Sequence, residues 1–158
     1  MASRSIFTAR EQKFLAALVE ERVPFLLVGL AAAALQGAPA VTQDIDLWFT
    51  NLRDPRLRRA LKRVGAAYVE PSMHNPPLFA GGGADLFDIV THMDGLDSFE
   101  IEARRAIRIR LGRIEVPVLP LERIIASKRA SGRPKDKAVL PALEATLRVL
   151  RERGKHDP

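Results

Sequence analysis

Two aspartates, two positions apart, interrupt an apolar run near residue 45. Within residues 40–49, Asp44 and Asp46 flank Ile45, and the apolar run continues to Phe49. Side chains alternate between the two faces of a strand, so both carboxylates are expected on one face and the apolar side chains on the other. Asp is depleted from strands because it packs poorly there. Two carboxylates about 6–7 Å apart on one strand face form either a divalent-cation clamp or the solvated face of an edge strand.

The composition indicates one soluble globular domain and excludes thiol chemistry. The chain has 158 residues, enough for one domain with a sizeable core, and it contains no cysteine. Its net charge of +6 favours polyanionic partners such as nucleoside triphosphates or RNA. The N-terminal residues lack the apolar core of a signal peptide, and the longest apolar stretch, residues 23–35, is too short to span a bilayer. We therefore expect a cytoplasmic protein without membrane contact.

Helix and strand signals alternate along the chain and predict a small α/β domain with a helical tail. We expect strands at residues 25–28, 44–50, 66–69 and 85–91, and a hairpin formed by residues 106–111 and 113–118. Helices are expected from Thr8, after Gly29, from Asp54, at 98–104, at 121–130 and from Arg133, with Pro141 kinking or breaking the last one. Residues 71–83, rich in Pro and Gly, are expected to form a mobile loop. Residues 1–158 would form a single domain, with its core over about 8–119 and C-terminal helices over about 120–153.

A cluster that holds metal ions needs a third carboxylate, and two positions offer one. Asp88 and Asp85 each lie between apolar residues in the strand expected at 85–91. They are three positions apart, so on a regular strand they face opposite ways. Only one of them can therefore join Asp44 and Asp46.

Two further side chains alternate with these acids. His92 shares the strand face of Asp88, and Trp48 shares that of Asp46. The three histidines of the chain match no zinc motif, but His92 could border a site at the acids. Trp48 could pack against a nucleobase or belong to the core.

Four segments, in this order, carry the most specific patterns of the chain. They are Val28-Gly29, Thr42-Gln43-Asp44-Ile45-Asp46-Leu47, Phe87-Asp88-Ile89-Val90-Thr91 and residues 121–136, which contain Gly132-Arg133-Pro134-Lys135-Asp136. Together they resemble the minimal nucleotidyltransferase family of the polymerase-β superfamily. The last segment is similar to the closing segment of a stand-alone prokaryotic subgroup of this family. That subgroup includes components of toxin–antitoxin and abortive-infection systems. In that subgroup the third acid opens a strand matched by residues 88–91, so the resemblance selects Asp88. It implies an α/β (α+β) fold: a small mixed sheet flanked by helices, with C-terminal helices.

The resemblance also implies an enzyme that transfers a nucleoside monophosphate from a nucleoside triphosphate (NTP) to a hydroxyl acceptor. Nucleotidyl transfer depends on positioning and on metal ions that neutralise phosphate oxygens. Asp44, Asp46 and Asp88 would be the catalytic residues and would hold Mg²⁺ (or Mn²⁺) in a two-metal mechanism, with Asp88 helping to deprotonate the acceptor. The acceptor could be RNA, a protein or a small molecule. A partner protein or a homo-oligomer could help to bind it.

The residues expected to bind the triphosphate lie outside the acid cluster. Gly29 lets phosphate oxygens approach the backbone at the start of the next helix, although a strand-to-helix turn alone would also favour glycine. The resemblance adds Thr42 to this nucleotide site. Lys128 or Arg133 could reach the triphosphate, or could instead complement a helix C-terminus or pair with Asp136.

Leu30 departs from the family pattern and keeps a second hypothesis open. Active members usually carry Ser or Gly at this place in the nucleotide site, where a Ser hydroxyl contacts phosphate, and Leu30 cannot make that bond. The chain could therefore be a non-catalytic binding module of the same fold, such as a toxin–antitoxin component or a nucleic-acid-binding protein. Arg108 and Arg110 could form a stripe for an RNA backbone, although the polar face of a hairpin is the simpler alternative. The intact set of three acids favours the enzyme.

Overall fold

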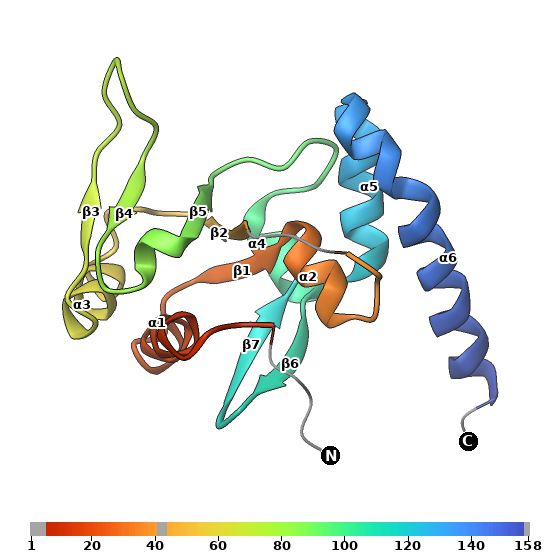
Figure 1. Ribbon diagram of the computed structural model, residues 1–158, viewed down its shortest axis with the longest axis horizontal. Coiled ribbons are helices and arrows are strands. Elements are labelled where there is room, and N and C mark those ends of the chain that lie inside the picture. Colours follow the sequence, from red (N-terminus) through yellow and green to blue (C-terminus); the bar gives the residue numbers. More distant parts are fainter. Residues whose placement is uncertain (1–5, 41–43, 157–158) are drawn as a thin grey trace.

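The computed structural model describes residues 6–40 and 44–156 and shows a mixed sheet with helices around it (Figure 1). Its helices are α1 (Ala9–Glu20), α2 (Gly29–Leu35), α3 (Pro55–Arg63), α4 (Phe99–Arg105), α5 (Leu121–Ser131) and α6 (Pro134–His156). Its strands are β1 (Phe25–Val28), β2 (Ile45–Phe49), β3 (Ala67–Val69), β4 (Leu78–Ala80), β5 (Phe87–Val90), β6 (Ile107–Leu111) and β7 (Ile114–Val118). A short 3₁₀ helix, η1 (Ala84–Leu86), precedes β5. Thr42, one of the expected nucleotide-binding residues, lies outside the described residues.

The central sheet contains parallel and antiparallel strands in the order β5-β2-β1-β7-β6. Strand β1 pairs antiparallel with β2 and parallel with β7, and β2 pairs parallel with β5. Strands β6 and β7 form the expected hairpin, and β3 and β4 form a separate small sheet. The predicted small mixed sheet flanked by helices is therefore confirmed.

Two expectations about the chain before β5 are wrong. Residues 78–80, expected within a mobile loop, form β4, because the side chain of Phe79 is buried against Phe14 of α1. Strand β5 begins at Phe87 and not at Asp85, because η1 occupies the preceding turn. Asp85 therefore does not lie on a strand of the sheet.

The core between the sheet and the helices is rich in aromatic side chains. Phe14 is fully buried, with its ring centre 5.6 Å from that of Phe79 and 5.3 Å from that of Phe87. Trp48 is also buried, and its ring lies perpendicular to that of Phe99 of α4 at 5.4 Å. Because α4 covers Trp48 in this way, the residue belongs to the core and does not offer a surface to a nucleobase.

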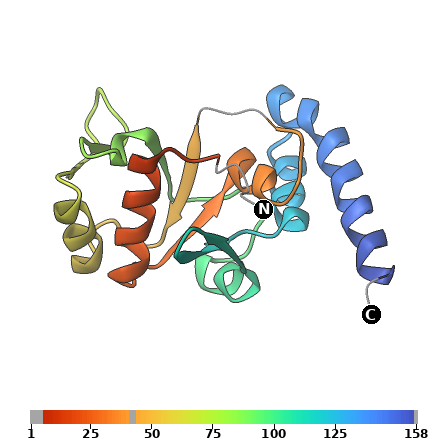
Figure 2. The same cartoon turned by 60° about the horizontal axis from the view of Figure 1, so that its bottom comes forward.

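Helices α5 and α6 form one end of the molecule, with α6 outermost in both views (Figure 1 and Figure 2). Gly132, at a φ of +63°, ends α5 as the sequence predicts. Pro141 does not divide α6 into two helices, contrary to one expectation. Pro141 and Lys137, whose carbonyl loses a helical hydrogen bond, are both exposed, so water can replace that bond. Among the helices that the structure describes, none combines the length and the apolar character needed to cross a membrane.

Candidate active site

Asp44, Asp46 and Asp88 face one cleft. The parallel register of β2 and β5 places Asp46 directly beside Asp88, and Asp44 immediately precedes β2. All three line a cleft of about 410 Å³ that is also bordered by residues of α2, α5 and α6. Asp85, on η1, does not line this cleft. The fold thus brings Asp88, and not Asp85, to Asp46 of β2 and the preceding Asp44.

Burial and mutual repulsion act on these carboxyl groups. Burial, followed by the charges of Asp88 and Asp44, raises the pKa of Asp46 to about 6, although Lys128 and Lys135 lower it. Burial and the charge of Asp44 also raise the pKa of Asp88. Carboxylates that repel one another are stabilised by a cation, so the chemistry of these donors fits Mg²⁺ or Mn²⁺. In the described part of the chain, no three acidic or histidine side chains are grouped tightly enough to hold one metal ion.

Gly29 makes room for Asp46 at the start of α2. Its φ of +71° lies in the left-handed region that favours glycine, and a Cβ at this position would lie 2.6 Å from Oδ2 of Asp46. A larger residue would therefore displace that carboxylate. The sequence pattern indicated a turn glycine but not this contact, which joins β2 to the β1–α2 turn. The next residue, Leu30, also lines the cleft.

The junction of α5 and α6 supplies cations to the same cleft. Lys128 and Arg133, both expected there, line it together with Lys135. Nζ of Lys128 lies 3.1 Å from Oδ1 of Asp136, and Nε of Arg133 lies 3.2 Å from Oδ2. Burial raises the pKa of Asp136, but hydrogen bonds from Ser131 and Lys128 outweigh it and hold that pKa below its usual value. Lys128, with 16% of its side chain exposed, is thereby held in place, whereas Arg133 is 73% exposed.

The connection between β5 and α4 forms another side of the cleft. His92, Met93 and Asp94 line it, and Nε2 of His92 lies 3.3 Å from Oδ1 of Asp94. The alternation of residues along the strand pointed to His92, but Asp94 resembles an ordinary turn residue and no pattern singled it out. Because Lys128 was already expected in the site, helical spacing could have predicted the other residues of α5 that line the cleft. The cleft-facing residues of α5 recur three or four positions apart. They are Ile124, Ser127, Lys128 and Ser131.

Gln36 joins two walls of the cleft, α2 and α5. Its side chain accepts a hydrogen bond from the N–H of Leu121 at 2.8 Å and donates to the carbonyls of Leu119 at 2.9 Å and Ala32 at 3.0 Å. Pro120 provides no side-chain cap for α5, so Gln36 satisfies one of the backbone donors at the start of that helix. This contact fixes the start of α5 relative to α2.

The mixed sheet and the helices around it match the nucleotidyltransferase-type fold expected from the sequence. No protein-family model matches the chain, and no curated protein sequence matches it. Among solved structures, the chain is similar to a crystal structure of ANT(2'')-Ia in complex with adenylyl-2''-tobramycin, with 21% identity, a TM-score of 0.53 and coverage of 90% of this chain and 95% of that chain. A solution structure of the antibiotic-resistance factor ANT(2'')-Ia is also similar, with 18% identity, a TM-score of 0.49 and coverage of 94% and 96%. ANT(2'')-Ia is an aminoglycoside nucleotidyltransferase, so the first of these likenesses confirms the predicted fold.

Proposed function

We propose that the protein transfers a nucleoside monophosphate from an NTP to a hydroxyl group of an acceptor. The pairing of Asp46 with Asp88 in a cleft that also contains Lys128 and Arg133 carries this proposal. Nucleotidyl transfer needs acidic groups that bind metal ions and cationic groups that bind phosphate, and this cleft offers both. The similarity in fold to ANT(2'')-Ia supports the same class of reaction.

In this proposal the acids and the cations of the cleft have separate roles. Asp44, Asp46 and Asp88 would hold Mg²⁺ or Mn²⁺ after moving closer together, because no three acidic side chains of the described residues are grouped to hold one ion as they stand. The ions would neutralise the phosphate oxygens in a two-metal mechanism. Lys128 and Arg133 bind the triphosphate through their charges. Asp88 is exposed on β5, an edge strand of the central sheet, where an acceptor hydroxyl can reach its carboxylate and transfer a proton to it.

The turn between β1 and α2 completes the proposed nucleotide site. Because Gly29 has no side chain, phosphate oxygens can approach the backbone beside Asp46. Thr42 stays a predicted contact. Leu30 offers no hydrogen bond to phosphate, and its position in the cleft favours the alternative, a non-catalytic binding module of the same fold. A toxin–antitoxin role, self-association and a cytoplasmic location stay predictions.

A small molecule is the acceptor class we propose. ANT(2'')-Ia was crystallised with an adenylylated small molecule, adenylyl-2''-tobramycin. The basic hairpin offers less to RNA than its sequence suggests, because Arg110 lies 3.6 Å from Glu115, and Arg108 lies opposite Pro117. Neither arginine lines the cleft.

Label transfer from each NTP tests the proposal. The protein is incubated with α-labelled NTPs, Mg²⁺ or Mn²⁺, and separate pools of small hydroxyl compounds, RNA and protein. We expect a labelled product and pyrophosphate with the unmodified protein, and neither with Asp46→Ala or Asp88→Ala. Asp85→Ala is the matched control, because this exposed acid is three positions from Asp88 but lies outside the cleft. An absence of metal-dependent NTP binding would refute the catalytic proposal, whereas binding without transfer would favour the non-catalytic alternative.

A further inference from the structure

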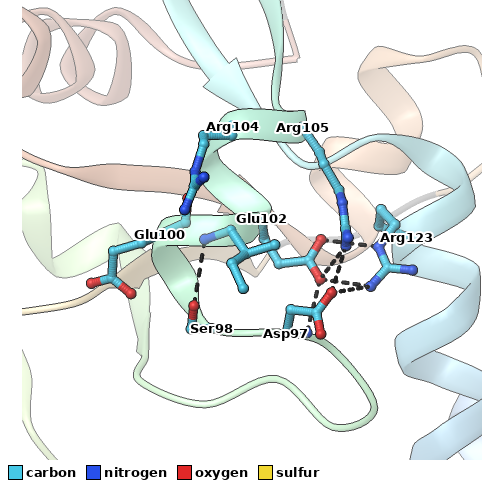
Figure 3. A network of polar contacts seen from close by, with 8 residues as sticks. Asp97, Ser98, Glu100, Glu102, Arg104, Arg105 and Arg123 are labelled. Atoms are coloured by element: carbon cyan, nitrogen blue, oxygen red, sulfur yellow. Dashed lines mark hydrogen bonds and ion pairs between the residues drawn. The ribbon is translucent and has the colours of Figure 1, made fainter.

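A fully buried carboxylate outside the cleft connects two of its walls. Glu102 of α4 has 0% of its surface exposed. Arg123 of α5 donates to it twice, from Nε to Oε1 at 2.9 Å and from Nη2 to Oε2 at 2.6 Å. The backbone N–H of Asp97 donates to Oε2 at 2.9 Å, and Arg105 donates to the same oxygen at 3.2 Å (Figure 3). These bonds, above all those from Arg123, hold the pKa of Glu102 below its usual value, so the group stays charged.

The network ends on the loop that lines the cleft. Asp97 closes the β5–α4 connection, and its carboxylate lies 2.8 Å from Arg105 and 3.9 Å from Arg123. Two residues earlier, Gly95 has a φ of +71°, and a Cβ there would lie 2.4 Å from Cβ of Ala130 on α5. The loop that contains His92 is therefore held against α5 at two points, Gly95 and Asp97.

The helix at the other end of the network carries Lys128, the partly buried cation of the cleft. On α5, Ser127 lies one helical turn after Arg123, and Lys128 lies five positions after Arg123. Neither Glu102 nor Arg123 lines the cleft, so neither can contact a ligand in it. A buried ion pair contributes little net stability compared with apolar side chains of similar size. Its specific geometry is the property that an apolar replacement would lose.

We propose that Glu102 is a positioning residue for nucleotide binding. Through Arg123 and Asp97, Glu102 sets the distance across the cleft between the β5–α4 loop and Lys128 of α5. The triphosphate would bind between these two sides. This inference rests on the proposed function, because it takes the NTP as the ligand of the cleft.

Binding of a fluorescent, non-hydrolysable NTP analogue with Mn²⁺ tests this role in Glu102→Gln. The matched control is Asp54→Asn, because Asp54 is also a buried carboxylate paired with an arginine, 2.7 Å from Arg56, but lies at the start of α3 outside the cleft. Both variants are expected to lower the melting temperature. Measured well below both melting temperatures, Glu102→Gln should raise Kd about tenfold or more, whereas Asp54→Asn should leave it within about twofold.

A second variant moves the loop without changing the carboxylate network. Gly95→Ala places a methyl group against Ala130 and is expected to raise Kd in the same way. Adding Ala130→Gly makes room for that methyl group and should recover part of the affinity. Circular dichroism confirms that each variant is folded before its affinity is compared.

The possible results separate this inference from the function on which it rests. If Glu102→Gln and Gly95→Ala weaken binding while Asp54→Asn does not, the positioning role is supported. If all of these variants melt earlier but bind the analogue as the unmodified protein does, Glu102 is merely structural and the inference is wrong. If the unmodified protein does not bind the analogue, the proposed function fails first and this inference fails with it.

Discussion

Replacing Asp46 with asparagine tests whether the negative charge of the Asp46 carboxylate destabilises the folded chain. Burial and the charges of Asp88 and Asp44 raise the pKa of Asp46 from 3.8 to about 6. The folded chain therefore retains a proton on this group at pH values where the unfolded chain has lost it. Folding stability must then fall as pH rises from about 4 to about 6, and the loss persists at higher pH. Asparagine imitates the protonated carboxyl group and avoids this loss.

The size of the effect follows from the pKa difference. A shift from 3.8 to about 6 corresponds to about 3 kcal/mol of stability at pH 8. For a chain of this length that free energy raises the melting temperature by about 6–12 °C. Near pH 4 the folded wild type already carries the proton, so the variant and the wild type should differ little.

Urea denaturation at pH 4 and pH 8 in a metal chelator measures this difference. Trp48 is the single tryptophan of the chain and is buried, so its fluorescence reports unfolding. Asp85→Asn is the control, because the residue is exposed and outside the cleft. Adding Mn²⁺ should stabilise the wild type more than Asp46→Asn. If Asp46→Asn is no more stable than the wild type at pH 8, the reasoning about its buried charge is refuted.

Three other substitutions test contacts around the cleft. Gly29→Ala should destabilise the chain by about 1–3 kcal/mol in urea and weaken Mn²⁺ binding, because of its positive φ and its contact with Asp46; an unchanged Mn²⁺ affinity would contradict this contact. Gln36→Leu should cost about 1–3 kcal/mol of stability in the same assay, because it leaves the N–H of Leu121 without this acceptor; a neutral result would show that water replaces it. Leu30→Ser should tighten NTP binding measured by calorimetry, and an affinity that is equal or weaker would mean that the residue does not face phosphate.

Much of the fold could be predicted because its signals are local. The capping box of Thr8 and Glu11 forms as its spacing predicts, since both hydrogen bonds join residues three positions apart. The alternation around Asp46 likewise predicts a strand, and β2 forms there with the neighbouring apolar residues buried. Residues 78–80 were missed because their Pro- and Gly-rich surroundings predict a loop, whereas burial of Phe79 in the core favours a strand.

The choice between Asp85 and Asp88 shows where local patterns end. Both acids lie between apolar residues, and alternation alone says only that they face opposite ways. The register between β2 and β5 places Asp88 beside Asp46, and it is set by the packing of strands that are distant in the sequence. The resemblance to nucleotidyltransferases selected the same residue, but periodicity could not.

The sequence by itself determined the acid pair on one strand face, the turn glycines and the basic α5–α6 junction, because each depends on interactions within a few residues. Only the tertiary structure brought Gly29 against Asp46 and joined Gln36 to Leu121, 85 positions away. The same holds for the bond between Glu102 and Arg123, 21 positions apart. Such contacts depend on how whole helices and strands pack, and residue spacing carries no record of that packing.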